Sequence, residues 1–280
     1  MELLQTITDL SHEFGTAAYV KGGGGNTSAK TADTLWVKPS GTTLAGLTPA
    51  AFVALDRSKL ARLYDLAVPA DSQKREALVK DLMGAAVKPG STGRPSVEAP
   101  LHDILTGAFV VHTHATLVNG MTCARNGAAS CARLFPEALW IPYVDPGFTL
   151  CMDVLRRVRG HRLVILENHG IFVAGDSADE IRDTYRRVLG IMCVEYRNAG
   201  IATELKSGAV PKLPEPVTPD HIVYGKTIEL GSAMAADAAL IRQFAEAFGG
   251  VQLLDQRAQN FIETWEVESY RQQQLPAHLS

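Results

Sequence analysis

Paired cysteines, long apolar runs and a dominant charge are all missing from this sequence. Its net charge is −3 and it has no long basic run, which argues against nucleic acid or an anionic membrane as a partner. No stretch of about 18 consecutive apolar residues occurs, so we expect no transmembrane helix. Four scattered cysteines form no CxxC pair and are expected to be reduced thiols of a cytoplasmic protein: Cys123, Cys131, Cys151 and Cys193.

The composition is that of a soluble globular protein, with 46% hydrophobic and 20% charged residues. Residues 1–16 have an amphipathic pattern without the cationic start and apolar centre of a signal peptide. We expect a catalytic domain over residues 1–205. Residues 206–280 are expected to form a connector, which begins with four prolines in residues 206–220, and a helical tail.

Predicted helices and strands are interleaved along the chain. The sequence predicts helices over residues 2–19, 58–65, 74–83, 98–105, 115–123, 149–158, 177–198 and 233–248, the first of them from apolar residues near helical spacing. Short apolar runs bounded by turn residues predict strands over residues 34–38, 108–113, 161–166 and 171–174. Because several gaps between strands are short, hairpins are indicated. An α/β fold with a mixed or antiparallel sheet is therefore favoured over a regular doubly wound fold.

Two histidines end the predicted strand at 108–113. Residues two apart in a strand point to the same face, so His112 and His114 can direct both imidazoles at one ion while Thr113 faces away. The alternative is a pair of hydrogen-bonded histidines without a metal. His169 favours the metal, because it lies in a turn after a buried strand and precedes a glycine that permits close backbone approach. Three neutral imidazoles suit zinc and leave one position open, whereas a closed structural site would need a fourth ligand.

Glu98 is the candidate acid/base, fourteen residues before the first of these histidines. A purely structural alternative is a carboxylate at a helix N-terminus, with Ser96 as the cap. His102 lies four residues later on the same predicted helix face. We interpret it as a buried structural histidine in preference to a fourth ligand.

Two glycine-containing segments are candidate anion sites. The run at 22–25 lacks the third glycine of a dinucleotide-binding fingerprint, and it has no P-loop lysine. Gly24, Gly25 and Asn26 can instead offer N–H groups and an amide to an anion, although a flexible linker is the alternative. The second segment offers turn N–H groups, a hydroxyl and an ammonium group through Lys38, Pro39, Ser40 and Gly41, and Arg94 is a third possible contact.

Five motifs occur in a recognisable order: GNTS, PSG, SVEAPLH, VVHTH and NHGI. Over residues 5–200 this order resembles the class II aldolase and adducin family, which includes the fuculose- and rhamnulose-phosphate aldolases. The segments WVKPSG, RPSVEAPLH, IPYVDPGF and TPDHIVYGK are similar to its long-insert branch, near the aldolase half of rhamnose-catabolic fusion proteins.

The resemblance implies a three-layer α/β/α sandwich with a largely antiparallel sheet, and a homotetramer with active sites between subunits. The tail would pack on the same or a neighbouring subunit. It also implies one divalent metal per subunit, Zn²⁺ first and Mn²⁺, Co²⁺ or Fe²⁺ as alternatives. The implied metal ligands are His112, His114 and His169, with Glu98 as acid/base and additional or transient ligand. The implied phosphate-binding residues are Gly25, Asn26, Ser40, Gly41 and Ser96.

The implied activity is that of a lyase of carbohydrate metabolism. It would cleave a ketose phosphate or a related sugar acid phosphate by retro-aldol chemistry through a metal-bound enediolate. The runner-up is a metal-dependent decarboxylase of a keto acid at the same site, and an epimerase or a non-enzymatic adducin-like domain are further alternatives. The family often has a second serine where this chain has Val97, which weakens one phosphate contact. Catalytic tyrosines of the family come from a neighbouring subunit, and Tyr143 and Tyr224 are the candidates here.

Overall fold

The computed structural model describes residues 2–66, 69, 71–203, 215–226, 230–265 and 270. Most of the predicted connector at 206–220 and the end of the tail therefore lie outside the described residues. Within the described part of the chain, no helix combines the length and apolar character that crossing a membrane requires.

A single sheet of seven strands forms the centre of the fold, in the order β3-β2-β1-β4-β7-β6-β5. Every neighbouring pair is antiparallel except β5 and β6, which are parallel. The predicted, largely antiparallel sheet is thus confirmed. The strands are β1 (Asn26–Lys30), β2 (Thr34–Val37), β3 (Val53–Asp56), β4 (Phe109–Thr113), β5 (Leu139–Ile141), β6 (Leu163–Leu166) and β7 (Gly170–Gly175).

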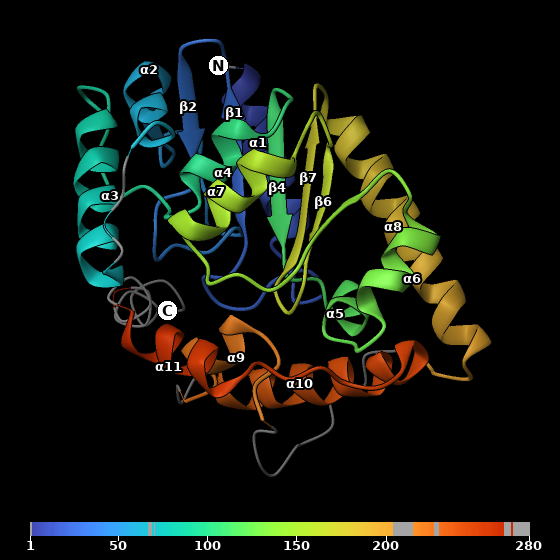
Figure 1. Ribbon diagram of the computed structural model, residues 1–280. Coiled ribbons are helices and arrows are strands. Elements are labelled where there is room, and N and C mark those ends of the chain that lie inside the picture. Colours follow the sequence, from blue (N-terminus) through green and yellow to red (C-terminus); the bar gives the residue numbers. More distant parts are fainter. Residues whose placement is uncertain are drawn as a thin grey trace.

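Helices cover both faces of this sheet. In Figure 1, α4 and α7 lie in front of the strands, while α1 lies behind them and α8 runs along the side of β6 and β7. The helices before the C-terminal segment are α1 (Glu2–Phe14), α2 (Arg57–Leu60), α3 (Ser72–Ala86), α4 (Ala99–Ile104), α5 (Thr116–Thr122), α6 (Gly127–Leu134), α7 (Phe148–Arg157) and α8 (Ala178–Asn198). Short 3₁₀ turns, η1 (Ala61–Leu63) and η2 (Glu246–Phe248), follow α2 and α10.

The C-terminal segment crosses one end of the sheet. Its helices are α9 (Pro219–Tyr224), α10 (Gly231–Ala245) and α11 (Gln256–Thr264). They lie below the strand ends in Figure 1, and α10 packs against α5. This segment therefore reaches the same end of the sheet at which β4 finishes.

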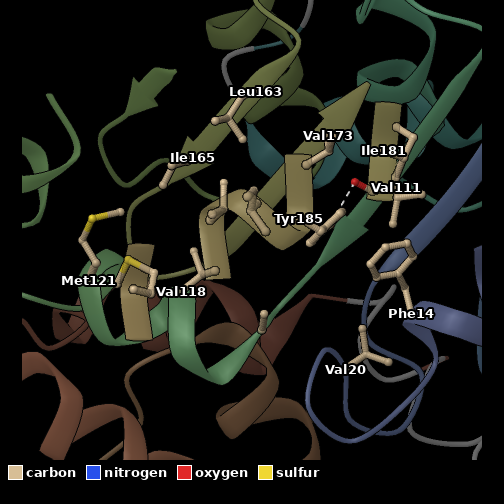
Figure 2. Packing of buried hydrophobic residues seen from close by; sticks show 14 of the residues in the cluster. Phe14, Val20, Val111, Val118, Met121, Leu163, Ile165, Val173, Ile181 and Tyr185 are labelled. Carbon is tan, nitrogen blue, oxygen red and sulfur yellow. Dashed lines mark hydrogen bonds between the residues drawn. The ribbon is translucent and has the colours of Figure 1, made fainter. Parts of the chain in front are cut away.

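Side chains from β4, β7 and α8 form the largest apolar cluster, part of which is drawn in Figure 2. Val111, Val173 and Tyr185 are at most 1% exposed. The Tyr185 hydroxyl also donates a 3.3 Å hydrogen bond to the Val111 carbonyl, so its polar atom is satisfied inside the core. Burying such side chains contributes roughly 1.5–3 kcal/mol each, which holds β4 rigidly in the sheet.

Alternation along β4 separates the apolar core from the polar site. Val111 and Thr113 face α8, where the Thr113 hydroxyl is 3.1 Å from the Tyr185 hydroxyl. His112 faces the opposite side and stacks on Phe172 with ring centroids 3.9 Å apart. Directly across the antiparallel pair, Asn26 of β1 is the partner of His112. The pleat therefore brings the GNTS and VVHTH motifs together.

Several element boundaries differ from the prediction. The first helix ends at Phe14 rather than near residue 19. A side chain on Gly15 would lie 2.6 Å from the Ala45 backbone nitrogen, so the chain makes a close backbone contact directly after this helix. Helices α6, α9 and α11 were not predicted. Helix α9 has six residues, too few to show a clear apolar period, and its position depends on packing against the rest of the fold.

Candidate metal and catalytic site

Three buried histidines converge at the end of β4. His112 comes from the strand itself, His114 from just beyond it, and His169 from the turn between β6 and β7. One nitrogen from each ring lies within 4.8 Å of the others, and among the described residues they are the group whose geometry suits a metal ion. Gly170 permits this approach, because a side chain there would lie 2.3 Å from the Thr113 carbonyl oxygen.

Hydrogen bonds determine which ring nitrogens face the centre of the cluster. His112 donates from Nδ1 to the Ile171 carbonyl at 3.0 Å, and His114 donates from Nδ1 to Asp220. Each ring therefore directs Nε2 inward, and these two Nε2 atoms are 2.9 Å apart. Two lone pairs at that distance repel unless a proton or a metal cation lies beside them. The donor set thus fits a divalent cation such as zinc.

Glu98 faces the same centre from the N-terminal end of α4. Its Oε1 is 3.3 Å from His112 Nε2 and 3.6 Å from His169 Nε2. Burial alone would raise the pKa of this carboxyl, but the surrounding imidazoles, His112 foremost, hold it well below its usual range. Burial lowers the pKa of His169 well below its usual range, so its ring is neutral. Glu98 is therefore an ionised oxygen ligand or proton acceptor beside the neutral ring of His169.

Asn26 and Ser96 connect Glu98 to the anion turns. The Asn26 side-chain amide donates to Ser96 Oγ and, at 3.3 Å, to Glu98 Oε2. Ser96 Oγ also accepts the Glu98 backbone N–H at 3.2 Å. These contacts orient the carboxylate, and they engage the amide that we had expected to face an anion.

The two predicted anion turns lie side by side. Ser40 donates its backbone N–H to the Arg94 carbonyl at 2.8 Å, so this N–H is engaged within the protein. Lys38 is 3% exposed, with its ammonium nitrogen 3.2 Å from the Gly23 carbonyl oxygen. Anion binding there thus depends on side chains more than on the turn N–H groups. One pocket joins these segments to the cluster, lined among others by Gly25, Lys38, Ser40, Gly41, Ser96, Glu98, His114 and His169.

His102 lies apart from the cluster despite its place in the SVEAPLH motif. It is fully buried, and Nδ1 is 2.7 Å from the Ser28 hydroxyl. Burial lowers its pKa to about 3 and keeps the ring neutral. It is absent from the metal-suited group found among the described residues, in agreement with its interpretation as a structural residue.

The sequence analysis did not identify Asp220 and Trp265 as pocket residues. Asp220 of α9 accepts the hydrogen bond from His114, and Trp265, just after α11, lines the same pocket. The sequence did contain a signal for the helix that carries Asp220, because Thr218 and Pro219 directly before it form a typical helix start. Nothing in the local sequence places Trp265 at the pocket.

The two candidate tyrosines lie outside this pocket lining. Tyr224 is fully buried behind the glycine run, where a side chain on Gly23 would lie 2.9 Å from its hydroxyl. Burial, assisted by Asp145, raises the pKa of Tyr143. Neither tyrosine is among the described residues that line the pocket.

A larger cavity adjoins the small pocket. The pocket at Glu98 encloses about 20 Å³, room for about one water molecule. The adjoining cavity encloses about 320 Å³ between α3, α7 and α11. Val97 and Trp265 line both spaces and thus separate them. Beyond them, apolar side chains such as Val79 and Phe148 share the wall with the charged residues Glu76, Lys80 and Arg94.

The motifs and this geometry agree with a comparison against protein families. The model described as Class II Aldolase and Adducin N-terminal domain matches residues 5–189. The chain belongs to the class II aldolase and adducin family. Members of this family that are aldolases use a divalent metal, and the buried histidine cluster is the corresponding feature here. The matched residues include every histidine of the cluster and end before α9.

Similar proteins support the fold over the same region. YuxG of Bacillus subtilis, described as an uncharacterized oxidoreductase, is 30% identical over 183 residues, which are 61% of this chain and 25% of YuxG. The chain thus matches about a quarter of that protein. The N-terminal class II aldolase domain from Thermoplasma acidophilum superposes with a TM-score of 0.59 at 26% identity, covering 68% of this chain and 91% of that domain. YgbL from Escherichia coli superposes with a TM-score of 0.51 at 19% identity, covering 69% of this chain and 87% of YgbL, and shows that the two proteins share the fold.

Proposed function

We propose that this protein is a metal-dependent aldolase that cleaves a ketose phosphate or a related sugar acid phosphate. The observation that carries the proposal is the meeting of three inward-facing imidazoles and one ionised carboxylate, Glu98, beside a pocket containing Lys38 and Ser40. The family match supports the reaction class.

His112, His114 and His169 would hold the metal, with zinc favoured by the all-nitrogen donor set. A bound divalent ion would act as a Lewis acid that polarises a substrate carbonyl and stabilises negative charge developing on its oxygen. Asp220 and the Ile171 carbonyl keep two of the rings in the tautomer that directs Nε2 inward.

Glu98 is the proposed proton carrier. In a retro-aldol cleavage the C4 hydroxyl loses its proton, the C3–C4 bond breaks, and its electron pair passes to the fragment that keeps the ketone. A proton must then reach C3 of that fragment. Glu98 is ionised and its Oε1 lies 3.3–3.6 Å from two ring nitrogens in the pocket, which supports a role in which it takes up the C4 hydroxyl proton and delivers a proton to C3.

The substrate's anionic end is proposed to lie against Lys38, Ser40 and Ser96. Because the pocket at Glu98 holds little more than a water molecule, a sugar phosphate must extend past Val97 and Trp265 toward the larger cavity. In a series of ketose phosphates, a Val97→Phe variant should lose activity first on the longest substrates. Equal loss on all lengths would show that substrate does not pass this point.

Metal dependence is the first test. Purified protein should contain a divalent ion, a chelator should abolish turnover, and added Zn²⁺ should restore it. Protein that contains no ion and whose turnover is indifferent to chelation would overturn the proposal.

A decarboxylase acting on a keto acid is the second candidate, favoured by one observation. Val97 places an apolar side chain beside Ser96, at the border of a cavity that Phe148 and Phe261 also line, and these apolar contacts suit a substrate less polar than a sugar phosphate. Loss of CO₂ also leaves an electron pair beside a carbonyl, so the same residues serve both reactions. Incubation with ketose phosphates and keto acids separates them, since an aldehyde product identifies the aldolase and CO₂ without aldehyde the decarboxylase.

A further inference from the structure

Helix α9 brings a carboxylate to a histidine of the cluster from outside the shared domain. Asp220 is 5% exposed and accepts the Nδ1 hydrogen bond of His114, while the family match ends at residue 189. The chain therefore adds a contact to the site from a segment more than a hundred residues away in sequence.

The glycine run makes room for this contact. A side chain on Gly24 would lie 2.5 Å from Asp220 Oδ2 and 3.2 Å from His114 Nδ1. Any larger residue at position 24 would thus push the carboxylate from the ring. The passage of α9 against His114 thus gives a structural reason for the glycine at position 24.

Two further contacts hold α9 in place. The Asn168 amide, directly before His169, donates to the Val217 carbonyl at 2.9 Å. On the other side, His221 of α9 lies 3.1 Å from Asp237 of α10. The turn that carries one proposed ligand thereby anchors the helix that orients another.

From this arrangement we propose that Asp220 is a positioning residue for the metal centre. Its carboxylate keeps the proton of His114 on Nδ1, so that Nε2 retains the lone pair that a metal requires, and it holds the ring's rotation. Carboxylates bound to ligating histidines act in this way in other metalloproteins, and their loss typically lowers metal affinity by about 10–100-fold. The inference rests on the proposed metal centre, but not on the reaction catalysed there.

The test compares Asp220→Ala and Asp220→Asn with the full-length protein. We expect the Zn²⁺ dissociation constant, measured by competition with a chromophoric chelator, to rise about 10–100-fold in Asp220→Ala. The rise should be smaller in Asp220→Asn, because an amide oxygen still accepts from Nδ1. Asp153→Asn is the matched control, since Asp153 is 7% exposed and pairs with Arg157 on α7. It should bind Zn²⁺ like the unchanged protein.

A spectroscopic readout separates positioning from a general loss of stability. At saturating Co²⁺, the visible absorption bands report the ligands and geometry of the ion, and they should change in Asp220→Ala but not in Asp153→Asn. Unchanged bands and unchanged Zn²⁺ affinity in Asp220→Ala would overturn the inference while leaving the proposed function intact. An unchanged protein that binds Zn²⁺ through His114 but has no lyase activity would overturn only the proposed function. Failure of that protein to bind any divalent ion would overturn both.

Discussion

Two buried histidine–aspartate pairs in this protein have the same composition but opposite surroundings. In the first, His114 gives its Nδ1 proton to Asp220, and Nε2 faces two other imidazoles across a pocket. In the second, His221 accepts the Thr218 backbone N–H at Nδ1 and is 3.1 Å from Asp237 through Nε2. The two histidines thus have opposite tautomers.

The difference shows what makes a buried pair a functional candidate. Both nitrogens of His221 are engaged within the protein, and Asp237 is further neutralised by Lys21 at 2.7 Å. His114 keeps one nitrogen directed at the cluster that it shares with His112 and His169. A pair whose second nitrogen is satisfied internally stabilises the fold, whereas one whose second nitrogen faces a pocket can bind a ligand.

The largest difference should come from removing the histidine of each pair. His114→Ala should remove turnover and reduce Zn²⁺ affinity by more than about 100-fold. Loss of a residue that only hydrogen-bonds to a metal ligand costs at most about that much, and His114 is a proposed ligand itself. His221→Ala should reduce stability while the folded protein still binds Zn²⁺. Chelator competition and urea unfolding measure the two effects. Equal metal loss in both variants would contradict the division between the pairs.

Glu98→Gln sharpens the assignment within the pocket. Removing the carboxylate's charge takes away the proposed proton carrier, so turnover should fall about 10²–10⁴-fold. Most of the metal should remain bound through the three imidazoles, as metal analysis of the purified variant can establish. Unchanged turnover would remove Glu98 from the mechanism.

Asp237→Asn tests the structural pair. The variant takes the carboxylate from the Lys21 ammonium, whose side chain is 13% exposed, and breaking a buried ion pair costs about 3–5 kcal/mol of unfolding free energy. Equilibrium urea unfolding measures this loss. A change below about 1 kcal/mol would mean that the pair adds no more than an exposed one.

The acid dependence of stability should differ between Asp237→Asn and the unchanged protein. Burial favours a higher pKa for Asp237, but His221 and Lys21 outweigh it and hold the pKa well below the usual range. A folded-state pKa below the unfolded value of about 3.9 stabilises the protein above that pH, and this stabilisation is lost as the pH falls toward the folded-state pKa. As the pH falls from about 5 to about 2.5, the unfolding free energy should therefore decline more steeply in the unchanged protein than in Asp237→Asn, and urea unfolding at each pH measures it.

The smallest effect is expected at an exposed ion pair. Arg186 and Asp183 form an ion pair on α8, with a guanidinium nitrogen 2.5 Å from a carboxylate oxygen and side chains 73% and 69% exposed. Because solvent screens such pairs, Asp183→Ala should change the unfolding free energy by less than about 1 kcal/mol. It provides the baseline for the buried pairs. If Asp183→Ala lost as much unfolding free energy as Asp237→Asn, burial would not be what distinguishes the two ion pairs.

Local sequence was sufficient where the signal was periodic or chemical. The alternation of VVHTH placed His112 and His114 on one face, and the NHGI turn brought a third imidazole to them, as the structure has it. The long helix α8 was predicted almost to the residue, because Ser177 caps it and its apolar residues recur at helical spacing. Short helices such as α9 gave no comparable signal, and its direct contact with His114 was not anticipated.

The anion turns illustrate a different limit. The turn that contains Lys38 and Ser40 was expected to offer its backbone N–H groups, the Ser40 hydroxyl and the Lys38 ammonium, but Ser40 donates its backbone N–H to the Arg94 carbonyl in the neighbouring turn. Which turn N–H is engaged depends on what packs beside it. Residue types indicated the polar character of this region, whereas the pairing of two turns decided which atoms face the pocket. The roles of these residues, the tetrameric state and the domain boundary near residue 205 stay predictions.

By itself, the sequence determined the family, the largely antiparallel α/β sheet and the histidines that form the cluster, because strand alternation and turn residues act over a few positions. Tertiary structure alone decided the tautomers of those histidines, the contact from Asp220 and the wall formed by Val97 and Trp265. These features join residues far apart in the chain. They exist only after burial has brought polar groups together and obliged each to find a partner.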